Sequence, residues 1–350
     1  MSFRRTLMLA VAGALVLAGC GQQNETTSDA AADAGVVNLY TARHYDADLK
    51  LYERFTELTG IRVNRIEGNA DQLIARMQAE GEASPADVFV VSDAGALWRV
   101  QNAGLFQSIN SQTLNAAIPA NLRDPEGRWY GFTRRARVVA YDPAKVRPED
   151  VDTYEEIASP RFRGRLCVRS ADNPYNLTLV GALIEAWGPE MTAEWARGIA
   201  ANLARPPEGG DRDQIRAVGA GVCEIALTNT YYYVLLGQGE DAADRALVER
   251  IQLAFPSLDG QGTHVNVSGG GVVAGAPNRE NAIRLVEFLA SPEAQTMVAA
   301  SNGEYPASPS VPVPSPVDAI ADFTAHPMSV AAYGPHTAQA LEIMTAAGWR

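Results

Sequence analysis

Tyrosines and one histidine follow the apolar runs of this chain, and their side chains could together hold a hard metal ion. Ligands of open α/β sheets bind beyond the carboxyl ends of the strands, so the residues just after each apolar run are candidates for a site. A phenolate oxygen suits a ferric ion better than softer divalent metals, and a neutral imidazole adds a nitrogen ligand. A highly charged cation also withdraws the phenol proton. The candidate ligands are His44, Tyr45, Tyr175, Tyr231 and Tyr232.

The same tyrosines also fit a purely structural interpretation. A tyrosine pair at the start of a helix, such as Tyr231 and Tyr232, more often packs or lines a binding wall than holds a metal. Tyr233, the next residue, is expected to point the other way and pack. Three further histidines have no ligand-type neighbour, so surface or core roles are expected for them. They are His264, His326 and His336.

The charge of such a metal site also has to be balanced. Four phenolates and one Fe(III) ion formally sum to a single negative charge, so a nearby cation would stabilise the complex. Arg43 is adjacent to the first two candidate ligands, and Arg135 or Arg137 could also reach the site. We therefore expect Arg43 and Arg135 to act as charge partners of the ligands.

Alternating strands and helices are expected to position these side chains. From Val36 onward, apolar runs typical of buried strands alternate with amphipathic stretches, which predicts a βαβαβ half of a parallel sheet. Gly60 is expected to end the first helix. The expected strands are 36–40, 61–66 and 87–91, and the expected helices are 46–58, 70–80 and 94–102.

A second series of elements follows, and the chain then returns towards its first half. Three glycines lie at the centre of the strand-like segment 265–273. The expected strands are 131–141, 165–169, 223–227, 251–255 and 265–273. The expected helices are 177–187, 192–203, 211–218, a helix or helix pair over 279–300, and 336–347, with an extended connector over 306–316.

The length of the chain indicates two lobes. About 315 residues follow residue 35, which exceeds the size at which single cores usually stop growing. We expect an α/β protein whose lobes each contain a mixed, mainly parallel sheet flanked by helices. The N-terminal lobe is assigned to 36–130 with 268–312, and the C-terminal lobe to 131–267 with 313–350. Because the chain passes between the lobes more than once, a hinge that closes around a ligand is expected.

The N-terminus has the pattern of a lipoprotein signal peptide. Arg4 and Arg5 precede a short apolar run, and Leu17-Ala-Gly-Cys20 resembles a lipobox. Residues 1–19 are therefore expected to be removed and Cys20 to be lipidated, with 20–35 as a flexible polar tether. The alternative is an ordinary secretory signal with an incidental cysteine. Both interpretations predict export, and lipidation predicts a membrane-anchored protein that faces the periplasm or the cell exterior.

The net charge of the chain disfavours negatively charged partners. Without residues 1–19 the chain has 27 basic and 41 acidic residues, a net charge of −14 that repels nucleic acid and anionic membranes.

Cys167 and Cys223 each lie in a short apolar segment. In an oxidising compartment they could form a disulfide between neighbouring strands, and two buried free thiols are the alternative.

Four segments of the chain match a known family. They are Thr41-Ala-Arg-His44-Tyr45, Ser84-Pro-Ala-Asp-Val-Phe89, Asn229-Thr-Tyr231-Tyr232 and Glu304-Tyr-Pro306. These segments resemble the ferric-ion-binding periplasmic proteins of iron ABC importers, the bacterial transferrin family. The similarity runs from about Val36 to the C-terminus. Within the family the chain is most similar to the cyanobacterial-type FutA branch, through Arg43-His-Tyr, Ile66-Glu-Gly68 and His264-Val-Asn-Val-Ser-Gly269.

The resemblance implies a type II periplasmic-binding-protein fold, a ligand set and partners. The FutA branch holds its metal with a His-Tyr pair from one lobe and three tyrosines from the other, usually without a synergistic anion. Carried over residue by residue, this set falls on the five candidate ligands named above. Another branch uses a glutamate and a bound anion, and Ser92 stands at that glutamate's position here. The implied cargo is Fe(III), with Fe(II) as the alternative, and the implied partners are an ABC permease and its ATPase, with this protein as a monomer.

Two other functions compete with iron binding. The same fold could bind an organic or oxyanion ligand, and an aromatic wall would then replace the metal site. An enzyme is the second alternative, but the chain lacks a Gly-x-Ser-x-Gly elbow, a His-Glu-x-x-His motif and a phosphate loop. We therefore expect a non-enzymatic iron-binding protein.

Overall fold

The computed structural model describes residues 34–318, 320 and 322–350. The expected signal peptide, Cys20 and the tether up to residue 33 lie outside these residues. The described part of the chain forms one compact unit.

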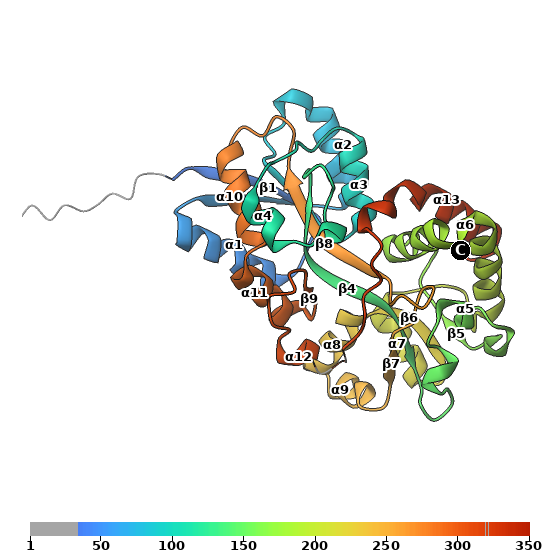
Figure 1. Cartoon of the computed structure of the whole chain (residues 1–350). Helices are drawn as coiled ribbons and strands as arrows, with labels where there is room; N and C mark the ends of the chain where they lie inside the picture. The colour runs from blue at the N-terminus through green and yellow to red at the C-terminus, as the bar shows by residue number, and fades with distance from the viewer. Residues whose placement is uncertain (1–33, 319, 321) are drawn as a thin grey trace, which may run out of the picture. The chain divides into compact units, whose positions relative to one another are not determined.

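A nine-stranded mixed sheet forms the centre of this unit, with the strand order β2-β1-β3-β8-β4-β6-β5 (Figure 1). Strands β7 and β9 both pair with β4 beside this order. The strands are β1 Val36–Thr41, β2 Arg62–Glu67, β3 Val88–Val91, β4 Tyr130–Tyr141, β5 Leu166–Cys167, β6 Ile225–Asn229, β7 Gln252–Ala254, β8 Val265–Val272 and β9 Tyr305–Pro306.

The helices flank this sheet. They are α1 Asp46–Thr59, α2 Ala70–Glu80, α3 Ala94–Asn102, α4 Gln112–Ala117, α5 Tyr154–Ile157, α6 Pro174–Asn202, α7 Asp211–Gly219, α8 Thr230–Gln238, α9 Ala242–Val248, α10 Arg279–Leu289, α11 Pro292–Asn302, α12 Ser315–Asp318 and α13 Thr337–Ala346.

The first half of the sheet confirms the expected βαβαβ unit. Strand β1 pairs in parallel with β2 on one side and with β3 on the other. Helix α1 ends at Gly60, which has a φ of 72° and donates its N–H to the carbonyl of Thr56. Because L residues with side chains disfavour this left-handed conformation, glycine is the residue best suited to stop the helix there.

Strand β4 belongs to both halves of the sheet. Its first part, from Tyr130 to Ala136, pairs antiparallel with β8. Its second part, from Arg137 to Tyr141, pairs antiparallel with β6. Figure 1 shows β4 and β8 running side by side between two groups of helices. These two long strands are therefore the covalent connection on which a hinge would depend.

The glycine run in β8 is explained by close strand packing. A Cβ atom at Gly269, Gly270 or Gly271 would collide with a backbone carbonyl oxygen of Tyr130, Phe89 or Arg128, respectively. Only glycine lets the chain approach its neighbours so closely. The three glycines thus serve sheet packing within a strand.

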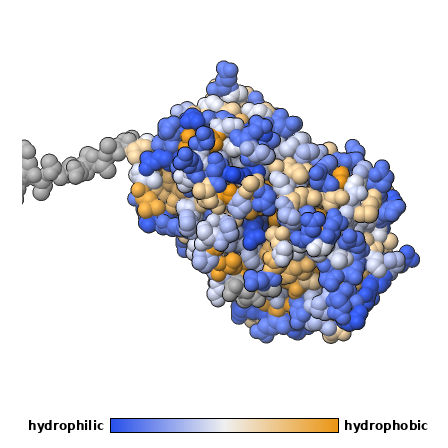
Figure 2. All heavy atoms as spheres, in the orientation of Figure 1, coloured by the Kyte–Doolittle hydropathy of each residue, from blue (hydrophilic) through white to orange (hydrophobic). Residues whose placement is uncertain are grey.

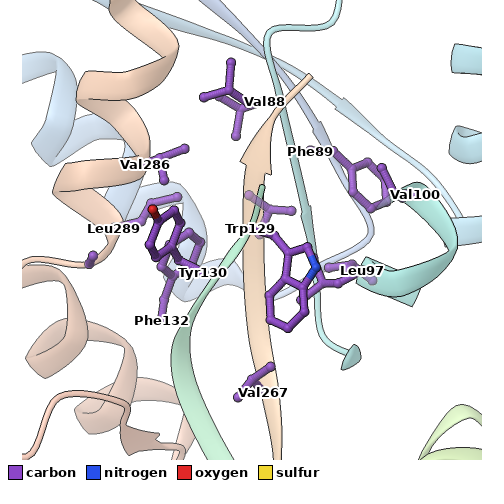
Figure 3. Close-up of a cluster of buried hydrophobic side chains, with 14 of the residues drawn as sticks. Val88, Phe89, Leu97, Val100, Trp129, Tyr130, Phe132, Val267, Val286 and Leu289 are labelled. Carbon is purple, nitrogen blue, oxygen red and sulfur yellow. The ribbon is translucent and has the colours of Figure 1, made fainter. Parts of the chain in front are cut away.

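Two hydrophobic regions lie on either side of the shared strands. The first is built from β1, β3, the start of β4, β8 and the surrounding helices, and Figure 3 shows part of it around Trp129 and Phe132. The second lies around α6, β6 and α13, with a smaller neighbouring cluster around α7. Val330 and Tyr333 pack in the first region. The residue boundaries of the two lobes stay a prediction.

Several elements differ from the sequence-based expectation. Helix α6 spans the two helices expected at 177–187 and 192–203, with a kink at Gly188, whose φ is 78°. Strand β6 continues to Asn229, two residues beyond its expected end. The expected connector over 306–316 contains part of β9 and the start of α12. Helices α4, α5 and α9 were not expected, because each is short and carries little helical periodicity.

One face of the molecule carries mainly polar residues (Figure 2). On the face shown in Figure 2, hydrophilic side chains predominate and apolar ones are scattered in small groups. In the described residues, no helix combines the length and apolar character needed to cross a membrane.

A disulfide joins Cys167 and Cys223, whose Cα atoms are 5.9 Å apart. Cys167 ends β5, and Cys223 lies two residues before β6, the strand with which β5 pairs in parallel. Both cysteines are buried. The bond thus ties together two strands whose following segments carry Tyr175 and Tyr231.

We expect both cysteines to resist thiol labelling in the folded, unreduced protein, tested on a fragment from Gly35 that lacks Cys20. Replacing both by serine should lower the free energy of unfolding by about 3–4 kcal/mol, because the bond closes a loop of 56 residues. Denaturant unfolding of the variant and of the reduced fragment should give similar losses. Ready labelling before reduction would show that the thiols are free.

Candidate metal centre

Three phenol groups from three separate elements converge in the structure. Tyr45 follows β1 as the N-cap residue of α1, Tyr175 lies in the first turn of α6, and Tyr231 lies in the first turn of α8. The Tyr175 and Tyr231 hydroxyls are 3.1 Å apart. The Tyr45 hydroxyl donates to that of Tyr231 across 3.5 Å. Residues far apart in the sequence thus bring their oxygens to one point.

The fold of each segment explains this convergence. Helix α6 begins where the Asn173 side chain accepts a hydrogen bond of 3.1 Å from the backbone N–H of Tyr175. Such an N-cap fixes the direction in which the first helical side chains leave the backbone. Helix α8 begins directly at the end of β6, so Tyr231 projects from the carboxyl end of that strand. This is the location expected for a ligand site in an α/β sheet.

The other two tyrosines of helix α8 have different environments. The Tyr232 ring packs against the Tyr231 ring, with centroids 4.0 Å apart. Tyr233 instead donates its hydroxyl to the carbonyl of Ile251 at 2.9 Å. The expectation that Tyr233 turns away and packs is therefore confirmed, while Tyr232 stays next to Tyr231 in the group of clustered tyrosines.

His44 lies apart from the converging hydroxyls in this conformation. Its side chain is 57% exposed, and its Nδ1 atom is 3.8 Å from a carboxylate oxygen of Glu67. It shares with Tyr175 the lining of a pocket of about 200 Å³. Of the five candidate ligands, the structure thus groups the four tyrosines, while His44 lines a pocket that it shares with Tyr175 alone among them.

The other three histidines have the ordinary roles expected for them. His264 is buried against the Tyr333 ring, and burial lowers its pKa to about 3. His326 is also buried, and its Nδ1 atom accepts a hydrogen bond from the backbone N–H of Met328. His336 pairs with Glu185 at 2.9 Å. In the described part of the chain, no three His, Cys, Asp or Glu side chains are grouped to hold a metal ion.

Arginines surround the phenol rings. The Arg43 guanidinium lies 5.1 Å from the centre of the Tyr45 ring, and the Arg135 guanidinium lies 5.6 Å from that of Tyr175. Arg169 stands 5.7 Å from the same Tyr175 ring. Positive charge at these distances favours the ionised form of a phenol and stabilises an anionic metal site.

The sequence did not identify Arg169 as part of this site. Its signal was its position at the end of the strand expected over 165–169, where ligand-contacting residues gather. Arg137, which was considered for the site, is instead held by Asp211 at 2.6 Å and by Asn176 at 2.7 Å. Asp211 also pairs with Arg169 at 3.0 Å.

Burial favours the neutral form of three of these phenols, those of Tyr45, Tyr231 and Tyr232. Burial raises the pKa of Tyr45 to about 12, and the neighbouring Tyr175 and Glu304 add to the shift. Burial also raises the pKa values of Tyr231 and Tyr232 well above the usual value, with Tyr175 again contributing to both. Ionisation therefore requires a cation that draws electron density strongly from the phenol oxygens. A hard, highly charged ion is the best match for this donor set.

The fold and the site together define a class of protein. Two core regions are joined by shared strands, and polar groups from separate elements meet at strand ends, as in two-lobe proteins that bind a solute. The chain belongs to the family of bacterial extracellular solute-binding proteins, whose model matches residues 50–326.

Similar proteins narrow this assignment. The chain is 45% identical over 346 residues to iron uptake protein A1 of Synechocystis, which covers 99% of this chain and 96% of the relative. A solved Trichodesmium structure, FutA (IdiA) in complex with iron and citrate ligands, is 47% identical with a TM-score of 0.87. It covers 90% of this chain and all of the other. The ferric binding protein of Campylobacter jejuni is 36% identical, with a TM-score of 0.85 over the same shares. The resemblance to iron-binding proteins of the FutA type is thus confirmed.

Proposed function

We propose that this protein binds iron outside the cytoplasm, as Fe(III), and delivers it to the permease of an ABC importer. The observation that carries the proposal is the meeting of the Tyr45, Tyr175 and Tyr231 hydroxyls, from three elements, within hydrogen-bonding distance. Phenol oxygens are hard donors that match a ferric ion. The names of the similar proteins, which refer to iron uptake and ferric binding, support the same conclusion.

The proposed ligands are the four clustered tyrosines and His44. Metal entry replaces the hydrogen bonds among the phenols with bonds to the ion, and each bound phenol gives up its proton. His44 is on the short segment between β1 and α1, and rotation of its exposed side chain away from Glu67 brings the imidazole to the metal. The guanidinium groups of Arg43, Arg135 and Arg169 face the rings of Tyr45 and Tyr175, where they favour the phenolate form.

Closure follows from the distribution of the ligands. His44 and Tyr45 come from the segment between β1 and α1, while the other three tyrosines come from α6 and α8. Only a closed arrangement gathers all of them around one ion, so metal binding favours that arrangement. The closed form then docks on the permease, which works with its ATPase.

The cellular setting of the proposal rests on the N-terminal sequence and on the family. Solute-binding proteins of importers act outside the cytoplasm and bind their ligand without converting it, so we propose no enzymatic activity. Anchoring through a lipid on Cys20 is part of the proposal, as is a monomeric state. The acidic surface makes a nucleic-acid partner unfavourable.

The test is a ferric titration of the fragment from Gly35 onward, followed by absorption. We expect one iron per chain and a visible charge-transfer band with a red-orange colour, because phenolate oxygens donate to Fe(III). Ferric nitrilotriacetate supplies the metal without precipitation. A colourless protein that leaves the iron with the chelator would refute the function, and binding of an organic or oxyanion solute instead would support the competing same-fold function.

A further inference from the structure

A buried carboxylate near the metal centre is not itself a proposed ligand. Glu304 follows α11, and its side chain is almost fully buried. Its Oε1 atom accepts a hydrogen bond of 3.1 Å from Arg43, and its Oε2 atom accepts one of 2.8 Å from Ser268. Thr133 donates a further hydrogen bond to Oε2. This single carboxylate thus contacts three segments of the chain.

One of these segments carries two proposed ligands. Arg43 directly precedes His44 and Tyr45, and its guanidinium is held on a second side by Asp48 through bonds of 3.0 and 3.1 Å. The cavity beside Arg43 and Asp48 measures only about 20 Å³, about the room of one water molecule. The arginine therefore has little space for another position, and the loop that follows it starts from a fixed point.

The other two segments are the strands shared by both halves of the sheet. Thr133 is on β4 and Ser268 is on β8, and the Ser268 hydroxyl accepts a hydrogen bond of 2.9 Å from Arg135. Arg135 is also 3.9 Å from Glu304 and faces the Tyr175 ring. A continuous buried network thus runs from the loop of Tyr45 through Glu304 to the arginine beside Tyr175.

The charges of this network balance. Arg43 and Arg135 carry two positive charges, and Asp48 and Glu304 carry two negative ones. Although burial opposes ionisation, Arg43 and Arg135 hold the pKa of Glu304 below its usual range. Loss of one carboxylate would leave a buried positive charge without its partner, which is far more costly than loss of an exposed pair.

We propose that Glu304 is a positioning residue for iron, which fixes the His44–Tyr45 loop to the shared strands and holds Arg135 beside Tyr175. This inference rests on the proposed function, because it assigns a role in the same site. Groups that hold metal ligands in place raise affinity by reducing the freedom that binding must remove. Glu304 accordingly couples the ligand loop of the first half to the strands on which closure depends.

The test compares Glu304→Gln with the wild type in the full-length chain, with ferric nitrilotriacetate as the iron source. The amide is nearly isosteric but lacks the charge, and its NH2 group cannot accept from a guanidinium. We expect ferric affinity to fall roughly tenfold or more, and the charge-transfer band to shift because Tyr45 binds in altered geometry. Wild-type iron binding in the same experiment checks the proposed function separately.

The matched control is Asp124→Asn. Asp124 is also buried and pairs with Arg128 at 2.9 Å, but among the described hydrogen bonds none joins it to the four clustered tyrosines. This variant should lose stability while keeping wild-type affinity and band position. An equal loss of affinity in the control, or unchanged affinity and band in Glu304→Gln, would overturn the inference.

A second variant covers the case in which Glu304→Gln does not fold. Ser268→Ala removes only the hydroxyl that links Glu304 to Arg135 and leaves all four charges in place. A weaker loss of affinity, by roughly threefold, together with a shifted band supports the positioning role. A wild-type band and wild-type affinity in this folded variant overturn it.

Discussion

Replacement of Tyr231 by phenylalanine is expected to remove most of the visible ferric absorption and to weaken iron binding by about 100-fold or more. Tyr231 is the only one of the clustered tyrosines whose hydroxyl contacts those of both Tyr45 and Tyr175 among the described hydrogen bonds. Its loss therefore removes the central oxygen of the group, not one at its edge. Competition between the variant and nitrilotriacetate for Fe(III) measures the effect.

The same helix supplies the matched control. Tyr233→Phe also deletes a phenol oxygen two residues away, but that oxygen bonds to the backbone of Ile251. It should cost about 1 kcal/mol of stability and leave the iron spectrum unchanged. Tyr232→Phe should weaken iron binding like Tyr231→Phe. Unchanged ferric affinity in both the Tyr231 and Tyr232 variants would remove these residues from the ligand set.

Iron loading near neutral pH is expected to release about one proton for each phenol that binds, three to four in all. Burial raises the pKa of Tyr45 to about 12 and those of Tyr231 and Tyr232 well above the usual value, so these phenols are protonated before the metal arrives. Because bound phenolates must lose those protons, acid opposes binding and ferric affinity rises with pH. Each released proton changes the affinity by about tenfold per pH unit.

A titration in weakly buffered solution measures this release directly. Ferric nitrilotriacetate is added at constant pH, and the base consumed is corrected for a blank of the chelate alone and for the proton that each freed nitrilotriacetate binds near neutral pH. The Tyr231→Phe protein serves as a second reference, since any residual binding should release fewer protons. Release of no proton by the wild type would mean that the ion is not held by phenolates.

The local features of this fold could be predicted from the sequence. The first βαβαβ unit follows from period-2 and period-3.6 apolar patterns, and the stop at Gly60 follows from its backbone freedom. The position of Tyr231 at a strand end was also accessible, because a short apolar run leads directly into it. Each of these predictions needs only residues that are close in the sequence, within the same helix or strand or the next one.

Non-local features could not be predicted in this way. No pattern within β4 shows that its first part pairs with β8 and its second part with β6. Glu304 lies 261 residues from Arg43 in the chain, and nothing near either residue indicates their contact. Similarly, the exposed position of His44 beside Glu67 depends on how β1 and β2 align. Such contacts are set by the packing of the whole sheet.

The division of β4 between two sets of partners has a mechanical consequence. Because β4 is hydrogen-bonded to β8 along its first part and to β6 along its second, the two halves of the sheet cannot slide past each other along this strand. They can move relative to each other only if β4 bends or twists where its partner changes. This change of partner lies between Ala136, which pairs with β8, and Arg137, which pairs with β6. Separating the two halves of the sheet into two polypeptides would leave unpaired strand edges on both. We therefore expect neither polypeptide to stay folded and soluble alone.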